Sequence, residues 1–150
     1  MEELYSLPAV FYVAVEGNGA KGRPLKAPGE TEPVIPTATS VLVPMVGFDV
    51  LDCPLDEKYV FRSEIAARVL NQPIRNRVTP ESIARLIAEL IRKGPESARI
   101  IPFINKVDSA GKMAGARNLA GEDGGQIFRF DKLSIFCSIS PNCLCIFLSP

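Results

Sequence analysis

A proline-rich run between positions 24 and 36 constrains the fold of this chain more than any other feature. The prolines are Pro24, Pro28, Pro33 and Pro36. Proline lacks a backbone N–H and disfavours helical geometry at the residue before it, so no helix can span this run. The sequence therefore predicts an extended, stiff loop, which begins with the Gly-, Lys- and Arg-rich stretch after Glu16.

The segment before this loop is compact and apolar. Residues 9–15 are mostly β-branched or aromatic and do not alternate with polar residues, which predicts a strand buried on both faces. A buried strand that leads into a charged loop is a common way for an α/β protein to present charge to a ligand. A second polar loop, residues 105–108, follows the apolar run 99–104. The two loops together suggest a nucleotide site.

The rest of the chain alternates apolar strands with amphipathic helices. The predicted elements are strands at 41–47 and 99–104 and helices at 63–70, 79–93 and, weakened by glycines, 109–121. Pro44 favours an edge or bulge position in its strand, and Thr79 can cap the longest helix. This order indicates an α/β fold with a mostly parallel sheet flanked by helices.

The end of the chain departs from this pattern. We divide the sequence into an α/β domain, 1–119, and a divergent apolar tail, 120–150. No charged residue follows Lys132, yet the serines, asparagine and proline of the tail argue against a membrane helix. A frame-shifted or truncated end is the alternative to a native element.

Composition excludes several classes of function. The chain has 150 residues, of which 47% are hydrophobic, so it has the length and composition of one globular domain. Its 17 basic and 17 acidic residues balance, which gives no electrostatic support for binding to nucleic acid or an anionic membrane. The absence of histidine excludes histidine acid–base chemistry and histidine metal ligands. The acidic start Met1-Glu2-Glu3 is unlike a secretory signal, so we expect a cytoplasmic protein.

Two glycine motifs in the loop fail because Arg23-Pro24 comes directly after them. Residues 17–22 match G-x-G-x-x-G, but Arg23-Pro24 prevents the helix that a dinucleotide site requires. Gly17 and Gly22 also have Walker spacing, but Arg23-Pro24 replaces the Lys-Ser/Thr pair that would hold phosphates. The chain therefore lacks a Walker A loop.

The charged residues of the loop are nevertheless candidates for a phosphate site. Lys21, Arg23 and Lys26 place three cations within six residues, among glycines that would let an anion reach backbone N–H groups. Glu16, at the end of the predicted strand, has the placement of a carboxylate linked to Mg²⁺. The alternative readings are a solvated basic loop and a strand-end carboxylate that meets solvent or Lys21.

The second polar loop has the pattern N-K-x-D, which GTP-binding proteins use to read guanine. The Asp108 carboxylate can accept two donors from one base edge, and the Asn105 amide can both donate and accept. The stem of Lys106 can cover the ring. The alternative is an ordinary polar turn at the end of a strand.

The proline-rich loop resembles the hallmark of the YqeC family of selenium-dependent hydroxylase accessory proteins. That hallmark is close to E-A-D-G-A-K-G-R-P-L-K-A-P followed by E-P-V-I-P, and it stands here at residues 16–28 and 32–36. Asn18 replaces the Asp of the family pattern. The likeness continues through the strand at 41–47, the long helix and the N-K-x-D loop, and it fades beyond Leu119.

The resemblance implies a P-loop NTPase-like fold that binds GTP or ATP with Mg²⁺ and helps to mature selenium-dependent molybdenum hydroxylases. Family members carry an N-terminal strand and a Gly-rich Lys-Ser/Thr loop that this sequence lacks, so we expect an incomplete fold that is inactive alone. The residues implied for the phosphates or metal are Glu16, Asn18, Gly19, Lys21, Gly22, Arg23 and Lys26. Those implied for the base are Asn105, Lys106 and Asp108. The implied partner is the hydroxylase or its cofactor machinery.

Two other hypotheses stay open at this point. In the first, the loop is the recognition surface of a non-enzymatic module that binds a partner hydroxylase or the molybdenum cofactor. In the second, the chain is a remnant that exposes apolar surface and an unpaired sheet edge, and therefore does not fold stably.

Overall fold

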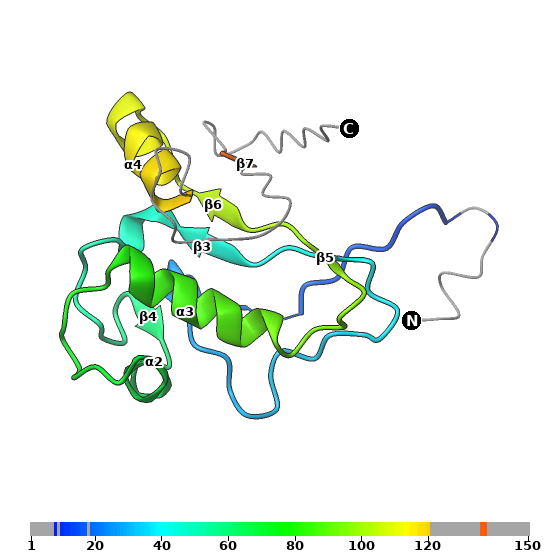
Figure 1. The fold of residues 1–150 in the computed structure, drawn as a ribbon, viewed down its shortest axis with the longest axis horizontal. Coiled ribbons are helices and arrows are strands. Elements are labelled where there is room, and N and C mark those ends of the chain that lie inside the picture. The colour runs from blue at the N-terminus through cyan, green and yellow to red at the C-terminus, as the bar shows by residue number, and fades with distance from the viewer. Residues whose placement is uncertain (1–7, 9, 18, 121–135, 138–150) are drawn as a thin grey trace.

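The computed structural model describes residue 8 and residues 10–17, 19–120 and 136–137. Within these residues the chain is an α/β protein with short strands and three α-helices (Figure 1). Every strand ladder among them is parallel, as the sequence predicts.

The longest pairing joins the two predicted strands, 41–47 and 99–104. Strand β2 (Val41–Leu42) pairs with β5 (Arg99–Ile100), and β3 (Met45–Gly47) pairs with β6 (Phe103–Asn105). The register is the same in both ladders, so they form one parallel ribbon with an interruption. The interruption coincides with Pro44 and Pro102, neither of which can donate a ladder hydrogen bond. Two backbone bonds bridge it, from Ile101 N to Leu42 O at 2.9 Å and from Phe103 N to Pro44 O at 2.8 Å.

A second strand pairing joins the proline-rich loop to the segment before the helix predicted at 63–70, and no sequence pattern predicts it. Strand β1 (Leu25–Lys26) pairs in parallel with β4 (Val60–Phe61). The N–H of Ala27 then donates to Phe61 O at 3.1 Å. Leu25, Ala27 and Val60 are buried, so this short ladder packs the middle of the loop against the core. The rest of the loop contains no helix, as its prolines require.

The helices match their sequence signals closely. Helix α2 is Ser63–Leu70 and α3 is Pro80–Ile91. Thr79 caps α3 because its hydroxyl accepts a hydrogen bond from Ser82 N at 3.2 Å. Helix α4 (Ala110–Ala120) forms despite its glycines, and Gly115 is needed there because a Cβ would lie 2.7 Å from the Phe48 ring.

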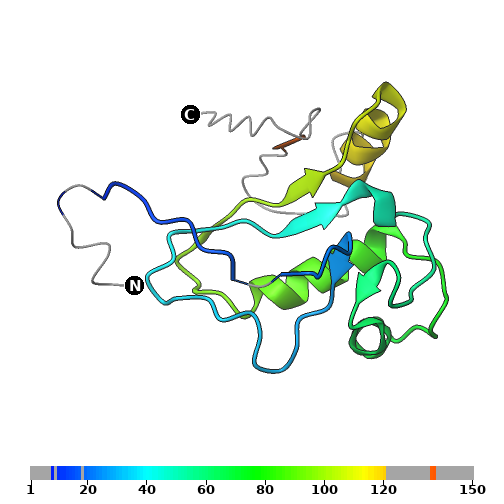
Figure 2. The ribbon, with the colours of Figure 1, turned by 180° about the vertical axis from the view of Figure 1, so that it is seen from behind.

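The core lies between the strands and the helices. In both views α3 lies between the β3–β6 pair and α2 (Figures 1 and 2). One buried cluster unites Leu25 and Val60 of the short ladder, Val46 and Ile104 of the ribbon, and side chains of all three helices. The helix residues of this cluster are Ala66, Leu70, Ile83, Leu86, Ile87, Ala116 and Leu119. The described residues therefore share one buried core.

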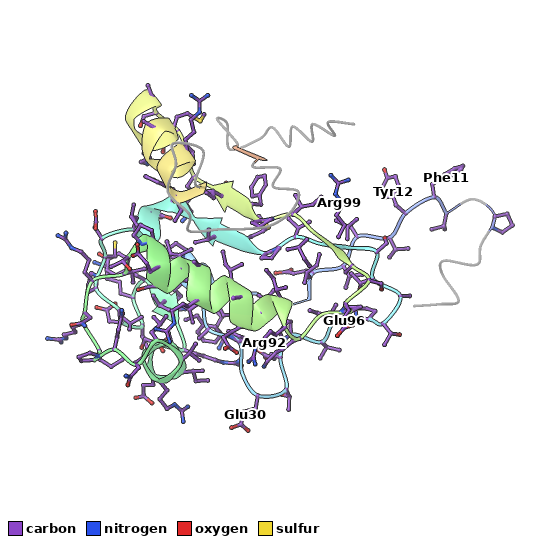
Figure 3. All side chains as sticks on the ribbon, in the orientation of Figure 1. Phe11, Tyr12, Glu30, Arg92, Glu96 and Arg99 are labelled. Atoms are coloured by element: carbon purple, nitrogen blue, oxygen red, sulfur yellow. The ribbon has the colours of Figure 1, made fainter. Side chains whose placement is uncertain are left out.

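The prediction of a buried strand at 9–15 is wrong for its described part. Residues 10–17 form no strand, and the side chains of Phe11 and Tyr12 are 87% and 85% exposed. Figure 3 shows both of them projecting from a segment that extends away from the core. An apolar segment is buried only where a neighbouring strand and a covering layer exist, and the described residues provide neither here.

The finer fold prediction is not confirmed: the architecture is α/β with short parallel strands, and a P-loop NTPase-like fold is not established. Most of the predicted tail lies outside the described residues, apart from β7 (Phe136–Cys137), which pairs in parallel with β6. No helix in the described part of the chain is long and apolar enough to cross a membrane.

Candidate functional site

The glycine- and lysine-rich stretch forms a tight turn that leads directly into β1. The N–H of Arg23 donates to Ala20 O at 3.0 Å, and both central residues have positive φ, 51° at Lys21 and 77° at Gly22. Two successive left-handed residues are typical of a type I′ turn, for which glycine is well suited at one position. The turn projects Lys21 and Arg23 beside the strand that carries Lys26.

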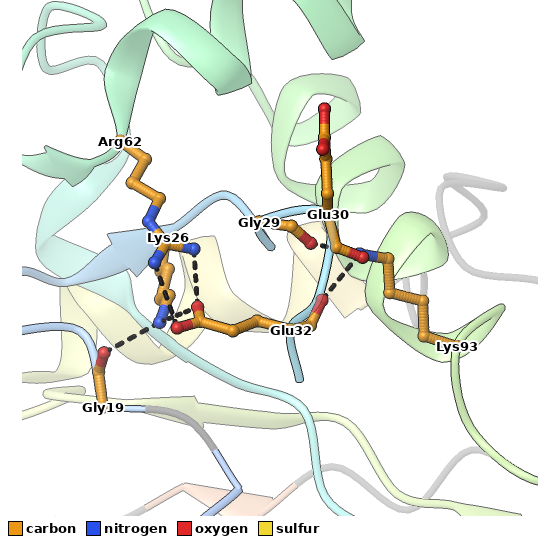
Figure 4. Close-up of polar contacts among 7 residues, drawn as sticks. All are labelled: Gly19, Lys26, Gly29, Glu30, Glu32, Arg62 and Lys93. Carbon is orange, nitrogen blue, oxygen red and sulfur yellow. Dashed lines mark hydrogen bonds and ion pairs between the residues drawn. The ribbon is translucent and has the colours of Figure 1, made fainter. Parts of the chain in front are cut away.

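A carboxylate from the same loop lies between two cations from different elements. Lys26 Nζ lies 2.9 Å from a carboxylate oxygen of Glu32. Arg62, the N-cap residue of α2, donates to both oxygens of the same carboxylate from its two terminal nitrogens, at 2.5 and 3.0 Å (Figure 4). The Lys26 side chain is only 10% exposed, and its ammonium also donates to Gly19 O at 3.1 Å. Because the Arg62 contact is bidentate and charge-assisted, it is a strong and directional one.

These side chains belong to a larger group around the ring of Phe61, which we call the cation cluster: Lys21, Arg23, Lys26 and Arg62. Their charged groups lie 5.0, 5.8, 5.2 and 5.3 Å from the ring centroid. Parallel pairing of β1 with β4 creates this arrangement, because it sets Lys26 opposite Phe61. Cations are attracted to the negative face of an aromatic ring, so Phe61 partly offsets their mutual repulsion.

The cation cluster keeps an excess of positive charge. Among the described residues, Glu32 supplies a carboxylate to two of the four cations, and no carboxylate forms an ion pair with Lys21 or Arg23. Arg23 instead donates to the backbone carbonyls of Lys21 and Glu57, each at 3.0 Å. Four cations around one ring repel each other, and a multivalent anion would relieve that repulsion.

A lysine after α3 fixes the backbone next to Glu32, in a segment we call the strap, residues 29–32. Lys93 Nζ donates to the carbonyls of Gly29, Glu30 and Glu32, the last at 2.6 Å (Figure 4). A Cβ on Gly29 would meet the Arg62 guanidinium, so glycine at this position leaves room for the contact between Arg62 and Glu32. The strap is therefore held by its backbone on one side and by the Glu32 carboxylate on the other.

The N-K-x-D loop follows β6, and its Asn105, Lys106 and Asp108 side chains form hydrogen bonds or ion pairs within the chain. Lys106, at φ 63°, donates its N–H to the Asn105 side-chain oxygen at 2.7 Å, and its ammonium pairs with Asp49 at 2.7 Å. Asp108 pairs with Lys112 of α4 at 2.8 Å, and the hydrogen bond from Lys112 lowers the pKa of the Asp108 carboxyl. Asp108 and Lys106 are exposed, so a ligand can reach both.

The last residue of β3, Gly47, contacts both predicted halves of the site. The N–H of Gly47 donates to Pro24 O at 2.8 Å, and a Cβ on Gly47 would lie 2.8 Å from the Pro24 ring. On its other side Gly47 is in register with Asn105. The proline-rich loop and the N-K-x-D loop therefore both contact the carboxyl end of β3, the edge at which α/β sheets bind ligands.

The predicted metal ligand lies apart from these contacts. Glu16 is exposed, and its carboxylate lies beside Gly19, 3.2 Å from where a Cβ on that glycine would be. Asn18 lies outside the described residues. No group of three acidic, cysteine or histidine side chains converges among the residues the structure describes. A single carboxylate such as Glu16 fits Mg²⁺ only where phosphate oxygens and water complete the coordination shell.

Sequence reasoning missed Phe61, Arg62 and the positions of Glu32 and Lys93. In the sequence Glu32 is only part of the hallmark, and Lys93 is only the last residue of the helix predicted at 79–93. The Phe61-Arg62 pair belongs to no motif and lies 35 positions beyond Lys26. Only the pairing of β1 with β4, two strands of two residues each, brings it to the loop.

Comparisons with known proteins agree with the resemblance of the loop. Residues 1–64 match the family model described as YqeC protein. The chain is also similar to "Uncharacterized protein YqeC" of Escherichia coli (strain K12), with 26% identity over 115 residues. That match covers 71% of this chain but only 43% of the relative, so the chain spans less than half of its length. No solved structure matches the chain. Both matches therefore show similarity to the YqeC family, one over residues 1–64 and the other to a relative from Escherichia coli.

Proposed function

We propose that this chain binds the phosphate groups of a purine nucleoside triphosphate, as part of an accessory protein that matures selenium-dependent molybdenum hydroxylases. The observation that carries the proposal is the cation cluster: three lysine or arginine residues expected at the phosphates gather around Phe61, and Arg62 joins them. The maturation role and the hydroxylase partner rest on the family resemblance of residues 16–36.

In this proposal the cation cluster neutralises the phosphates, and the N-K-x-D loop meets the base. Arg62 offers the planar pair of donors that suits a phosphate, and Lys21 and Lys26 add point charges. Glu16 would share Mg²⁺ with phosphate oxygens. Asp108 would exchange Lys112 for the donors of a guanine edge, which is feasible because their ion pair is exposed.

Calorimetric titration of the chain with Mg·GTP, Mg·ATP and tripolyphosphate at low salt tests the proposal. We expect all three to bind, because phosphate contacts dominate. Asp108→Ala should weaken GTP about tenfold and leave tripolyphosphate unchanged, since only the base contact is lost. Equal loss for GTP and ATP would refute guanine recognition, and no binding of any of the three would refute the proposed function.

A second candidate is a non-enzymatic module that binds the hydroxylase or the molybdenum cofactor. The engagement of Lys106 with Asp49 and of Asp108 with Lys112 favours it, because both base-reading side chains already have partners. Nucleotide-independent capture of a purified selenium-dependent hydroxylase by this chain would support this candidate.

A further inference from the structure

Glu32 has the position and geometry of a bound anion within the cation cluster. Its two carboxylate oxygens accept from the two terminal nitrogens of Arg62 at 2.5 and 3.0 Å, and one of them lies 2.9 Å from Lys26 Nζ. Arginine binds carboxylate and phosphate through the same planar, two-point contact. The Glu32 carboxylate therefore takes the place that two phosphate oxygens would take.

The strap allows the carboxylate to leave without moving the backbone. Lys93 holds the strap through its carbonyl oxygens and does not contact the Glu32 carboxylate. The Glu32 side chain is 31% exposed, so solvent can receive it after rotation about its side-chain bonds. Figure 4 shows Lys93 and the Arg62–Lys26 pair approaching the strap from opposite sides.

Charge favours a phosphate over the carboxylate at this position. A carboxylate brings one negative charge, whereas a terminal phosphate brings between about 1.5 and 2 and more acceptor oxygens. A polyphosphate can also contact Lys21 and Arg23, which form no ion pair among the described residues. We propose that Glu32 is an internal competitor at this site, and that a phosphate of the ligand displaces it from Arg62 and Lys26. The inference rests on the proposed binding of phosphates by the cation cluster.

Glu32→Gln tests this competition, with Glu30→Gln as the matched control. Both changes remove one negative charge from the strap, but Figure 4 shows the Glu30 side chain pointing away from Lys26 and Arg62. In titrations with tripolyphosphate at low salt, E32Q should bind about threefold to tenfold more tightly than the wild type. E30Q should bind as the wild type does, and thermal melts should show that both variants are folded.

The outcomes separate the two claims. If neither the wild type nor E32Q binds tripolyphosphate, the proposed function fails. If the wild type binds and E32Q binds equally or more weakly, phosphate binding stands and the competition is refuted. Should E32Q not fold, the side-chain carboxyl carbons of the wild type decide by ¹³C NMR. During a tripolyphosphate titration the Glu32 signal should move and the Glu30 signal should not, and an unmoved Glu32 signal would overturn the inference.

Discussion

The cation cluster and the N-K-x-D loop are both polar, but they differ in how their charges are brought together. The four cations of the cluster come from the proline-rich loop and from the start of α2, and pairing of β1 with β4 joins these segments. In the N-K-x-D loop, Asp108 pairs with Lys112, one helical turn along the chain. The cation cluster therefore depends on the tertiary fold, whereas the Asp108–Lys112 pair depends on local spacing, and in this loop only Lys106 pairs with a distant residue, Asp49, among the ion pairs of the described residues.

This difference distinguishes a group of charges assembled by the fold from an ion pair, Asp108–Lys112, that forms between neighbours along the chain. Local ion pairs on the surface contribute little and form wherever sequence spacing allows them. A group of like charges from distant segments is unfavourable by itself, so it requires either a structural counterion or a ligand. Glu32 is a counterion for two of the four cations, and the imbalance makes the cation cluster the stronger candidate for a ligand.

The strongest test of this contrast is removal of Arg62. Arg62→Ala should weaken tripolyphosphate binding about tenfold to a hundredfold, because a charge-assisted, bidentate contact is lost. Arg68→Ala, on the exposed side of α2, should have little effect. Similar losses in the two variants, measured by calorimetry, would show that only overall charge matters.

A companion variant separates ligand binding from fold stability at the same position. Arg62 has φ 62° and ψ 49°, a left-handed conformation that costs a non-glycine residue about 1 kcal/mol. Arg62→Gly should therefore be about 1 kcal/mol more stable than Arg62→Ala in urea unfolding, yet bind tripolyphosphate just as weakly. If affinity followed stability instead, Arg62 would be a structural residue and not part of the site.

The next largest effect concerns the strap. Lys93→Met keeps the aliphatic stem but removes the donor to three carbonyls, and we expect it to lower the free energy of unfolding by about 1 to 2 kcal/mol. Arg92→Met is the control, because Arg92 pairs only with Glu89 of its own helix among the described residues. Urea unfolding of both variants measures the difference. Equal, small decreases in the free energy of unfolding would show that Lys93 does not stabilise the strap.

The same distinction between local and tertiary causes explains what the sequence could predict. Helix α3 was predictable because Thr79, Pro80 and the apolar stripe are local signals. The ribbon was predictable in outline because its strands are apolar, although Pro44 and Pro102 divide it. Strands β1 and β4 were not, since each has two residues and exists only through pairing with the other.

The residues of the candidate site also fall into those that a local motif identifies and those that only the tertiary structure identifies. Lys21, Arg23 and Lys26 were found because they lie close together in one motif. Phe61 and Arg62 carry no sequence signal, and only tertiary pairing assigns them to the site. The strand predicted at residues 9–15 failed for the converse reason: its composition is right for a buried strand, but no described segment pairs with residues 10–15.

The smallest expected effect lies in the N-K-x-D loop and tests whether the Asp108–Lys112 pair is independent of the Lys106–Asp49 pair. The hydrogen bond from Lys112 lowers the pKa of Asp108, so the folded pKa lies below that of the unfolded chain. Such a group stabilises the fold above its unfolded pKa, and the contribution is lost as the pH falls through the folded value. Lys112→Gln should raise the pKa of Asp108 toward its ordinary value, as measured from its carboxyl carbon in a ¹³C NMR titration at acid pH. Lys106→Gln, which removes the partner of Asp49 instead, should leave the Asp108 titration unchanged. If the pKa of Asp108 rises in both variants, the two ion pairs of the loop are coupled. The charges of the loop would then depend on the tertiary fold, as those of the cation cluster do.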